Sequence, residues 1–162
     1  MSILALVVAA QAAVAGSIPL TADHWETDGE VAFETRDDRA VMRLGAPVAG
    51  KRSGAVATVK GLTFKTGVIE YEVMLPDVTE FSGPIFHQPN AMTGEYIYFR
   101  PHMSGRPDSI QYTPIVNGST AWQIFGGPGF EAQGTFPLNR WMHVRVDVYP
   151  TSALVSVDGK PL

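Results

Sequence analysis

Aromatic side chains with polar tips alternate along one stretch in the middle of the chain. Tyr96, Tyr98 and Arg100 occupy every second position, so in an extended strand they share one face, opposite Ile97 and Phe99. A solvent-facing row normally carries Thr, Ser, Lys and Glu. Phenol rings and a planar guanidinium instead suit a sugar, because rings stack on its C–H face while polar groups bind its hydroxyls. The row therefore predicts a saccharide-binding surface.

Residues of the same chemical kind surround this row between positions 87 and 130. A sugar needs directed hydrogen-bond partners as well as stacking rings, so we expect them to complete the recognition surface. The residues predicted to bind the saccharide are His87, Tyr96, Tyr98, Arg100, Gln111, Tyr112, Asn117 and Trp122. The alternative is a polar and aromatic core layer in which these groups satisfy one another. For any single residue, a place in such a core layer is the better interpretation. For the row as a whole, saccharide binding is the better interpretation.

The elements that must position these residues are strands. From Val31 onward, runs of β-branched and aromatic residues are separated by Gly, Pro, Asn and Asp at roughly the 8–12-residue spacing of an all-β sandwich. No stretch has a helical period, and antiparallel strands without a crossover helix indicate two packed sheets. The strands expected are Val31–Thr35, Ala40–Leu44, Ser53–Val59, Val68–Leu75, Phe81–Phe86, Glu95–Arg100, Ser109–Thr113, Trp122–Phe125, Arg140–Val148 and Ala153–Val157.

Length and composition describe one domain with a substantial core. The chain has 162 residues, of which 45% are hydrophobic and 17% charged, and this balance argues against disorder. It has no Cys, which excludes disulfides and thiolate metal sites. With a net charge of −4 it lacks the basic field that attracts nucleic acid or anionic lipid. No apolar run reaches the ~20 residues of a membrane-spanning helix.

The first 15 residues are typical of an export signal. Residues 3–15 read ILALVVAAQAAVA, an apolar stretch that ends in small residues, and we expect cleavage before Gly16, with a second candidate site after Ala12. A basic n-region is missing, since the first Arg or Lys is Arg36. The alternative is a buried helix or strand at the start of the domain. Export without Cys favours a bacterial periplasmic or extracellular protein.

The mature domain, residues 16–162, ends inside a recognisable element. Asp158-Gly159 is a strong hairpin-turn signal after the strand at 153–157, and only Lys160-Pro161-Leu162 follows it. Either this return is a short edge strand, where a proline is tolerated, or a C-terminal strand is missing from an incomplete sandwich. We expect the second, with further domains in a longer chain.

Three segments carry motifs that point to a family. They read FRPHMSGRPDSIQYTP at 99–114, with NG at 117–118 and AWQ at 121–123, GVIEYEV at 67–73, and RWMHVRV at 140–146. With these motifs the chain resembles, over residues 25–162, bacterial exported proteins of the concanavalin A-like lectin/glucanase superfamily, which includes laminin-G-like modules and 3-keto-disaccharide hydrolase domains. The resemblance implies a jelly roll of two curved antiparallel sheets whose concave face binds saccharide, with the first and last strands side by side.

The resemblance also leaves an enzymatic alternative, a glycoside-degrading enzyme of the 3-keto-glycoside hydrolase or lyase type. Proton abstraction beside a keto group needs a base and a stabiliser for the developing oxyanion. Glu95 and His102, which extends the aromatic row beyond Pro101, are the predicted acid/base pair. The spacing of the histidines has no metal-site specificity, so no metal or other cofactor is predicted, and a Ca²⁺ requirement stays open.

A glucanase-like reaction is the other enzymatic alternative that the superfamily suggests. Its glucanases carry acids on alternate positions of one strand, and here Glu70 and Glu72 share a face, with Met74 where a third acid should follow. Retaining hydrolysis needs two carboxyl groups about 5–5.5 Å apart across the scissile bond. Without the third acid, a solvated sheet face is the better interpretation of this pair.

Overall fold

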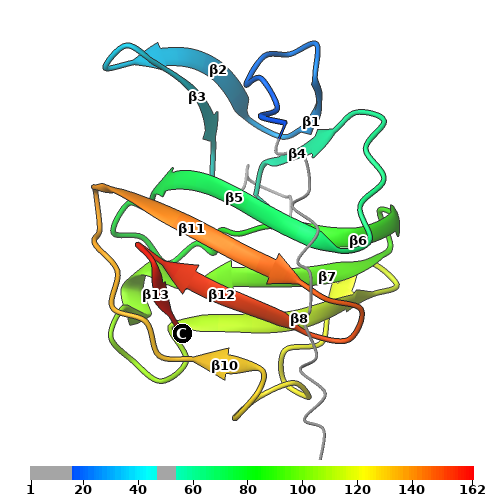
Figure 1. The fold of residues 1–162 in the computed structure, drawn as a ribbon, viewed down its shortest axis with the longest axis vertical. Helices are drawn as coiled ribbons and strands as arrows, with labels where there is room; N and C mark the ends of the chain where they lie inside the picture. The colour runs from blue at the N-terminus through cyan, green and yellow to red at the C-terminus, as the bar shows by residue number, and fades with distance from the viewer. Residues whose placement is uncertain (1–15, 47–53) are drawn as a thin grey trace, which may run out of the picture.

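The computed structural model describes residues 16–46 and 54–162, and these residues form antiparallel β-strands and one short 3₁₀ turn (Figure 1). The strands are arranged in two larger sheets and two separate two-stranded ribbons. The expected all-β fold is therefore confirmed. The predicted signal peptide, residues 1–15, lies outside the described part of the chain.

The first larger sheet, which we call sheet I, holds the middle of the chain. Its strand order is β10-β8-β7-β6, and the short β9 pairs with β8. The strands are β6 (Ile85–Asn90), β7 (Thr93–Phe99), β8 (Ile110–Val116), β9 (Ser119–Thr120) and β10 (Glu131–Ala132). In the β7–β8 pair, Tyr98 lies opposite Gln111 and Phe99 opposite Ile110. Because directly opposed residues point to the same side, the two pairs occupy opposite faces of the sheet.

The second larger sheet, sheet II, has the strand order β13-β12-β11-β5 and lies in front of sheet I in Figure 1. Its strands are β5 (Gly67–Met74), β11 (Trp141–Val148), β12 (Ala153–Val157) and β13 (Lys160–Pro161). The turn between β12 and β13 has φ angles of 49° at Asp158 and 74° at Gly159. Positive φ at both positions suits a two-residue hairpin turn. After this turn, Lys160 and Pro161 pair with Val157 and Ser156 of β12.

The core lies between the two sheets and consists of the apolar side chains that alternate along their strands. On β11 the burial alternates without a break, so that Met142, Val144, Val146 and Val148 face inward as the sequence predicts. Sheet II adds Leu75, next to β5, and Val157, while sheet I and its loops contribute Phe86, Ile97, Phe99, Ile110 and Phe136. Two antiparallel sheets that share one apolar layer are consistent with a β-sandwich.

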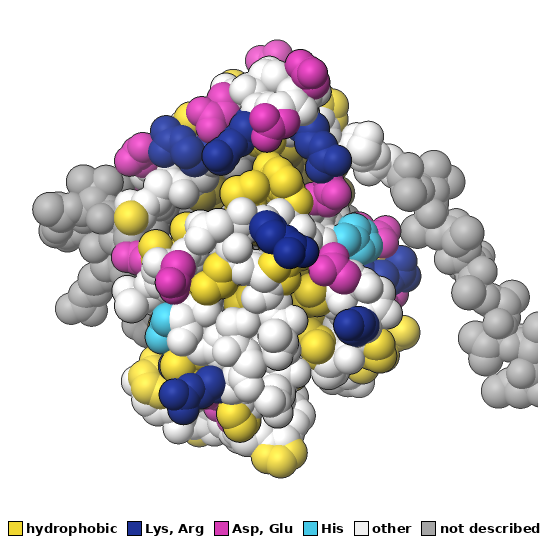
Figure 2. Space-filling model, turned by 90° about the vertical axis from the view of Figure 1, so that its left-hand side faces the viewer, with side chains coloured by type: hydrophobic (Ala, Val, Ile, Leu, Met, Phe, Trp, Pro, Cys, Tyr) yellow, Lys and Arg dark blue, Asp and Glu magenta, His cyan; other side chains and the backbone are white. Residues whose placement is uncertain are grey.

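The two ribbons lie beyond β5, at the upper end of Figure 1. They pair β1 (Trp25–Asp28) with β4 (Val56–Val59) and β2 (Val31–Arg36) with β3 (Arg39–Leu44). An ion pair of 2.8 Å between Arg39 and Glu72 connects the β2–β3 ribbon to β5. Figure 2 shows acidic and basic side chains interspersed over this end, and Arg43 and Glu30 form one such pair at 2.8 Å.

Two strand predictions differ from the structure, and both differences have a local cause. The strand expected at 81–86 begins only at Ile85, since Gly83 and Pro84 precede it and Ser82 makes an isolated bridge to Phe99. The strand expected at 122–125 is a turn, closed by the hydrogen bond from Ile124 N–H to the Ala121 carbonyl at 3.0 Å. The short strands β1, β9 and β10 were not predicted from the sequence. Ser53, the first residue of the strand expected at 53–59, lies outside the described residues.

Candidate functional site

The outer face of sheet I points away from the shared core, yet it is buried where β7 and β8 run side by side. Tyr98 and Gln111 are only 3% and 6% exposed. Thr113, two residues further along β8, is completely buried. An antiparallel sheet of a sandwich commonly exposes its outer face to water, so other parts of the chain must cover these residues.

Two loop segments provide the cover. The loop between β9 and β10 is anchored by the backbone N–H of Ala121, which donates to Thr113 Oγ1 at 3.0 Å. The segment before β6 is held against β7 by two backbone hydrogen bonds between Ser82 and Phe99, of 2.8 and 3.3 Å. This second anchor places the Phe81 ring over the outer face of the sheet. The two segments cover the same patch of sheet I, since Phe81 and Trp122 line one pocket there.

A pocket of about 100 Å³ lies between these segments. Its lining residues are Phe81, Tyr98, Arg100, Gln111 and Trp122. The residues Phe81 and Trp122 are half exposed, at 50% and 49%, and form its mouth, whereas the buried Tyr98 and Gln111 form its floor. The centroids of the Phe81 and Tyr98 rings are 5.1 Å apart. The pocket thus combines exposed rings with buried polar groups.

A chain of hydrogen bonds runs across the pocket floor. The Tyr98 hydroxyl donates to Gln111 Oε1 at 2.8 Å, and Gln111 Nε2 donates to Glu131 Oε1 at 2.6 Å. Glu131 comes from β10, where it lies opposite Gln111 in the register. Three strands therefore contribute one residue each, and the orientation of the Gln111 amide is fixed at both ends.

Arg100 supplies the positive charge of the pocket and is itself paired. Its Nη1 donates to the side-chain carboxylate of Asp108 and to the Asp108 carbonyl oxygen, the latter at 3.1 Å. The guanidinium carbon lies 5.8 Å from the centroid of the Phe81 ring, within cation–π range. Arg100 Nε is buried and has no hydrogen-bond partner among the described residues. The guanidinium is consequently held in one place by the Asp108 carboxylate, the Asp108 carbonyl oxygen and the Phe81 ring.

The tyrosines of this face are uncharged at neutral pH. Burial raises the pKa of Tyr98 above 10.0; the charge of Arg100 lowers this pKa, and those of Glu131 and Asp108 raise it. The Tyr96 ring lies 4.9 Å from that of Tyr98, and burial raises the pKa of Tyr96 as well. Both phenols can therefore donate and accept hydrogen bonds.

Half of the predicted binding residues meet at this pocket. Tyr98, Arg100, Gln111 and Trp122 line it. Tyr96 lies next to it on the same face, and the His102 ring stacks on Phe81 with their centroids 6.2 Å apart. His102 is in the 3₁₀ turn Pro101–Met103 and is exposed. Tyr96, Tyr98 and Arg100 of the expected row therefore share one face of sheet I, where Tyr98 is buried rather than at the surface.

Glu95 and Tyr112 lie on the other, core-facing side of sheet I. The Tyr112 hydroxyl donates to Glu95 Oε2, and the Tyr112 ring stacks on Phe130 with centroids 6.0 Å apart. Burial raises the pKa of Tyr112, and the hydrogen bond to Glu95 raises it further. Since alternate residues of a strand face opposite ways, β7 separates Glu95 from Tyr98 and Arg100. The structure does not bring Glu95 and His102 together.

The remaining two predicted residues have structural roles away from the pocket. His87 has a positive φ of 49° at the irregularity in β6, and its Nε2 lies 2.5 Å from the Lys65 carbonyl oxygen. Its ring contacts Phe64 and Phe86. Asn117 is exposed in the turn between β8 and β9, with a φ of 51°. Neither side chain lines the pocket.

Three residues of the site escaped the sequence analysis as site residues: Phe81, Asp108 and Glu131. Phe81 was assigned to a strand, and only the Ser82–Phe99 bridge turns it over the sheet. Asp108 pairs with Arg100 across the turn between β7 and β8. Glu131 is 20 positions from Gln111, and only the pairing of β10 with β8 connects them. Of these three residues, only Asp108 could have been predicted from the sequence, because it lies eight positions after Arg100 and carries the opposite charge.

The acidic pair considered for a glucanase reaction lies on the outer face of sheet II. Glu72 is the partner of Arg39, and Glu70 Oε1 lies 3.3 Å from Arg145 Nη1 and 3.4 Å from His143 Nε2. These side chains are between 39% and 54% exposed. The two carboxylates are therefore engaged in ion pairs on a solvated surface.

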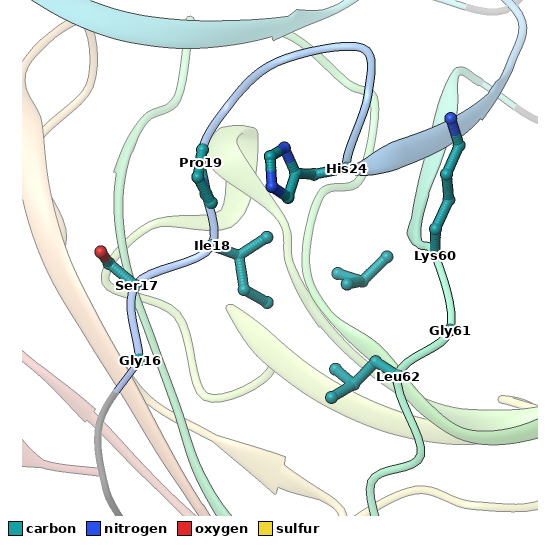
Figure 3. Close-up of a pocket in the computed structure, with 9 residues that line it drawn as sticks. Gly16, Ser17, Ile18, Pro19, His24, Lys60, Gly61 and Leu62 are labelled. Carbon is teal, nitrogen blue, oxygen red and sulfur yellow. The ribbon is translucent and has the colours of Figure 1, made fainter.

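A larger hollow near the start of the described chain is less suited to recognition. It is a shallow groove of about 420 Å³, and Figure 3 shows Ile18 and Leu62 pointing into it. Two of its three polar side chains have local partners: His24 Nδ1 lies 2.9 Å from Thr21 Oγ1, and Lys60 Nζ donates to the Ala22 carbonyl at 3.0 Å. The groove therefore offers mainly an apolar wall.

Within residues 16–46 and 54–162, no three His, Asp or Glu side chains gather closely enough to hold a metal ion. In the same residues no helix has the length and hydrophobicity of a membrane span. Comparisons with protein-family models, curated proteins and solved structures find no match to this chain.

Proposed function

We propose that this protein binds a saccharide in the pocket between Phe81 and Trp122. The observation that carries the proposal is a pair of half-exposed rings above a floor of phenol, amide and guanidinium groups. Aromatic rings offer apolar faces to the C–H groups of a sugar, and the polar groups offer fixed partners to its hydroxyls. The same combination in a buried core would not leave both rings open to solvent.

The size of the pocket limits what it can enclose. About 100 Å³ is well below the roughly 300–1,000 Å³ of pockets that surround a drug-sized ligand. We infer that it takes one ring of a glycan, and that most of the ligand stays in solvent. A contact of this size gives weak binding to a single site, which a multivalent glycan surface can strengthen.

Binding is favoured over glycoside hydrolysis by the positions of the carboxylates. Hydrolysis needs a carboxyl pair on either side of the scissile bond. Asp108 and Glu131, the carboxylates next to the pocket, are each bonded to a lining residue, namely Arg100 and Gln111. Glu95, the proposed acid/base residue of the enzymatic alternative, lies on the other face of β7.

A substitution at the pocket mouth tests the proposal. Trp122→Ala removes one stacking ring, and we expect at least a tenfold loss of affinity for the glycans that the wild type binds, about 1.4 kcal/mol. A glycan array selects the ligands, and nuclear magnetic resonance titration measures the affinities. Ile124→Ala is the matched control, because Ile124 is 80% exposed in the same loop but does not line the pocket.

Two outcomes contradict the proposal. One is that the folded wild type binds no glycan on the array. The other is that Trp122→Ala and Ile124→Ala leave the affinity for every bound glycan unchanged. Turnover of glycosides or 3-keto glycosides by the wild type, lost in Glu95→Gln and His102→Ala, would support the enzymatic alternative instead.

The resemblance stated above suggests further proposals about the whole protein. We propose that the two sheets form a concanavalin A-like jelly roll, and that sheet I supplies the ligand-binding face. We also propose export to the periplasm or the extracellular space, with residues 1–15 as the signal and further domains as partners. Sequencing the N-terminus of the protein from its native host tests the export proposal, since an intact Met1 would contradict it.

A further inference from the structure

The charges around the pocket floor do not balance. Arg100 is paired with Asp108 through its guanidinium. Glu131 contacts the floor through Gln111, and no Lys or Arg of the described residues lies within ion-pair distance of its carboxylate. Arg100 is the only charged residue that lines the pocket, and two carboxylates, Asp108 and Glu131, lie directly behind the lining. Counted together, these three groups carry one positive and two negative charges, so the surroundings of the floor have a net negative charge.

The hydrogen-bond chain on the floor has a fixed direction. A carboxylate only accepts hydrogen bonds, so Gln111 must turn its Nε2 toward Glu131 and its Oε1 toward Tyr98. The Tyr98 hydroxyl then donates to Gln111, and the oxygen lone pair of Tyr98 is left for a ligand. A sugar hydroxyl can donate to this oxygen, whereas a ligand carboxylate has no hydrogen to donate.

Resting on the saccharide-binding function proposed above, we infer that the site takes an uncharged sugar ring and rejects an acidic one, with Glu131 as the residue that sets this preference. Glu131 acts in two ways: its charge repels an anion, and its bond to Gln111 orients the acceptors on the floor. Glu131 is half-buried and bonded to the buried Gln111, so water screens its charge less than it screens a pair on the open surface. Glu131 is a positioning residue, since it acts through Gln111.

Matched sugars test the inference on the wild-type protein. The probes are the methyl glycosides of glucose, galactose and mannose, each compared with the methyl glycoside of its uronic acid, which differs only in a carboxylate at C6. For a pair in which the neutral sugar binds, we expect its affinity to exceed that of the uronate at least tenfold at 20 mM salt. The ratio should shrink at 500 mM salt, because salt screens the repulsion.

The variant Glu131→Gln keeps the shape of the side chain and removes its charge. We expect it to narrow the ratio of neutral to acidic affinity at least threefold and to weaken the salt dependence. Glu72→Gln is the control, because it makes the same change of net charge on sheet II, outside the pocket. Circular dichroism establishes that both variants are folded. If Glu131→Gln does not fold, the ratio of neutral to uronate affinity in the wild type, and its dependence on salt, still test the inference.

The outcomes separate this inference from the proposed function. Uronate binding as tight as neutral binding, or an unchanged ratio in folded Glu131→Gln, overturns the inference and leaves saccharide binding in place. If no probe of any pair and no glycan on the array binds the folded wild type, the proposed function is overturned and the inference with it.

Discussion

On the outer face of sheet II, Glu70, Arg145 and Asp147 form ion pairs in contact with solvent, with Arg145 Nη2 2.6 Å from Asp147 Oδ1. On the outer face of sheet I, Tyr98 and Gln111 lie buried beneath two loop segments. Both faces belong to strands that alternate polar and apolar residues. They differ because the loop between β9 and β10 and the segment before β6 cover one of them.

The difference shows what the cover does to a polar group. An exposed ion pair contributes little to stability, since water already solvates both charges. A buried hydroxyl or amide costs free energy unless it has a partner, so its hydrogen bonds must be complete. The covered face therefore has the fixed geometry that recognition needs, and the open face does not.

The strongest test of this comparison removes one polar group from each face. Gln111→Leu leaves the buried Tyr98 hydroxyl without its acceptor, and we expect the free energy of unfolding to fall by about 2 kcal/mol. Glu70→Gln on sheet II should cost less than about 1 kcal/mol. Urea unfolding measures both. Equal losses would contradict the assigned difference between the faces.

A second test measures how the free energy of unfolding changes at alkaline pH. Burial raises the pKa of Tyr96 in the folded state above its ordinary value of 10.0. Its contribution is therefore complete below pH 10 and is lost as the pH rises further, because the unfolded chain releases the proton more readily. Between pH 9 and pH 11 the wild type should lose about 1 kcal/mol more than Tyr96→Phe. If the wild type and Tyr96→Phe lose the same free energy of unfolding over this range, the folded state does not raise the pKa of Tyr96, which contradicts the prediction.

The smallest effect is expected on the stability of the fold at acid pH, and it comes from Asp147 on the exposed outer face of sheet II. The hydrogen bonds and charge of Arg145 lower the pKa of Asp147 below 3.8, against a smaller opposing effect of burial. This contribution is present above pH 3.8 and is lost as the pH falls through the lowered pKa. Asp147→Asn should flatten the stability curve slightly below pH 4, with little change at pH 7. A large change at pH 7 would mean that the Arg145 pair is not the solvated surface contact described.

The sheet residues of the site were predictable, whereas the residues that complete it were not. Tyr98 and Arg100 are two positions apart on one strand, so period-two alternation places them together. Glu95 belongs to the opposite alternation, and pairing it with His102 disregarded that rule. Phe81 and Glu131 reach the pocket through a single bridge and a two-residue strand, and short pairings of this kind leave no periodic pattern in a sequence.

By itself the sequence determined the all-β class, the long strands and the two faces of each, because alternation is a local property of an extended backbone. The tertiary structure alone decided which outer face the loop segments cover and which residues form hydrogen bonds with Gln111. It also decided that Glu131 contributes a charge to the site. These features depend on contacts between segments that are distant along the chain, and the free energy of such contacts depends on the whole fold rather than on the residues of one strand.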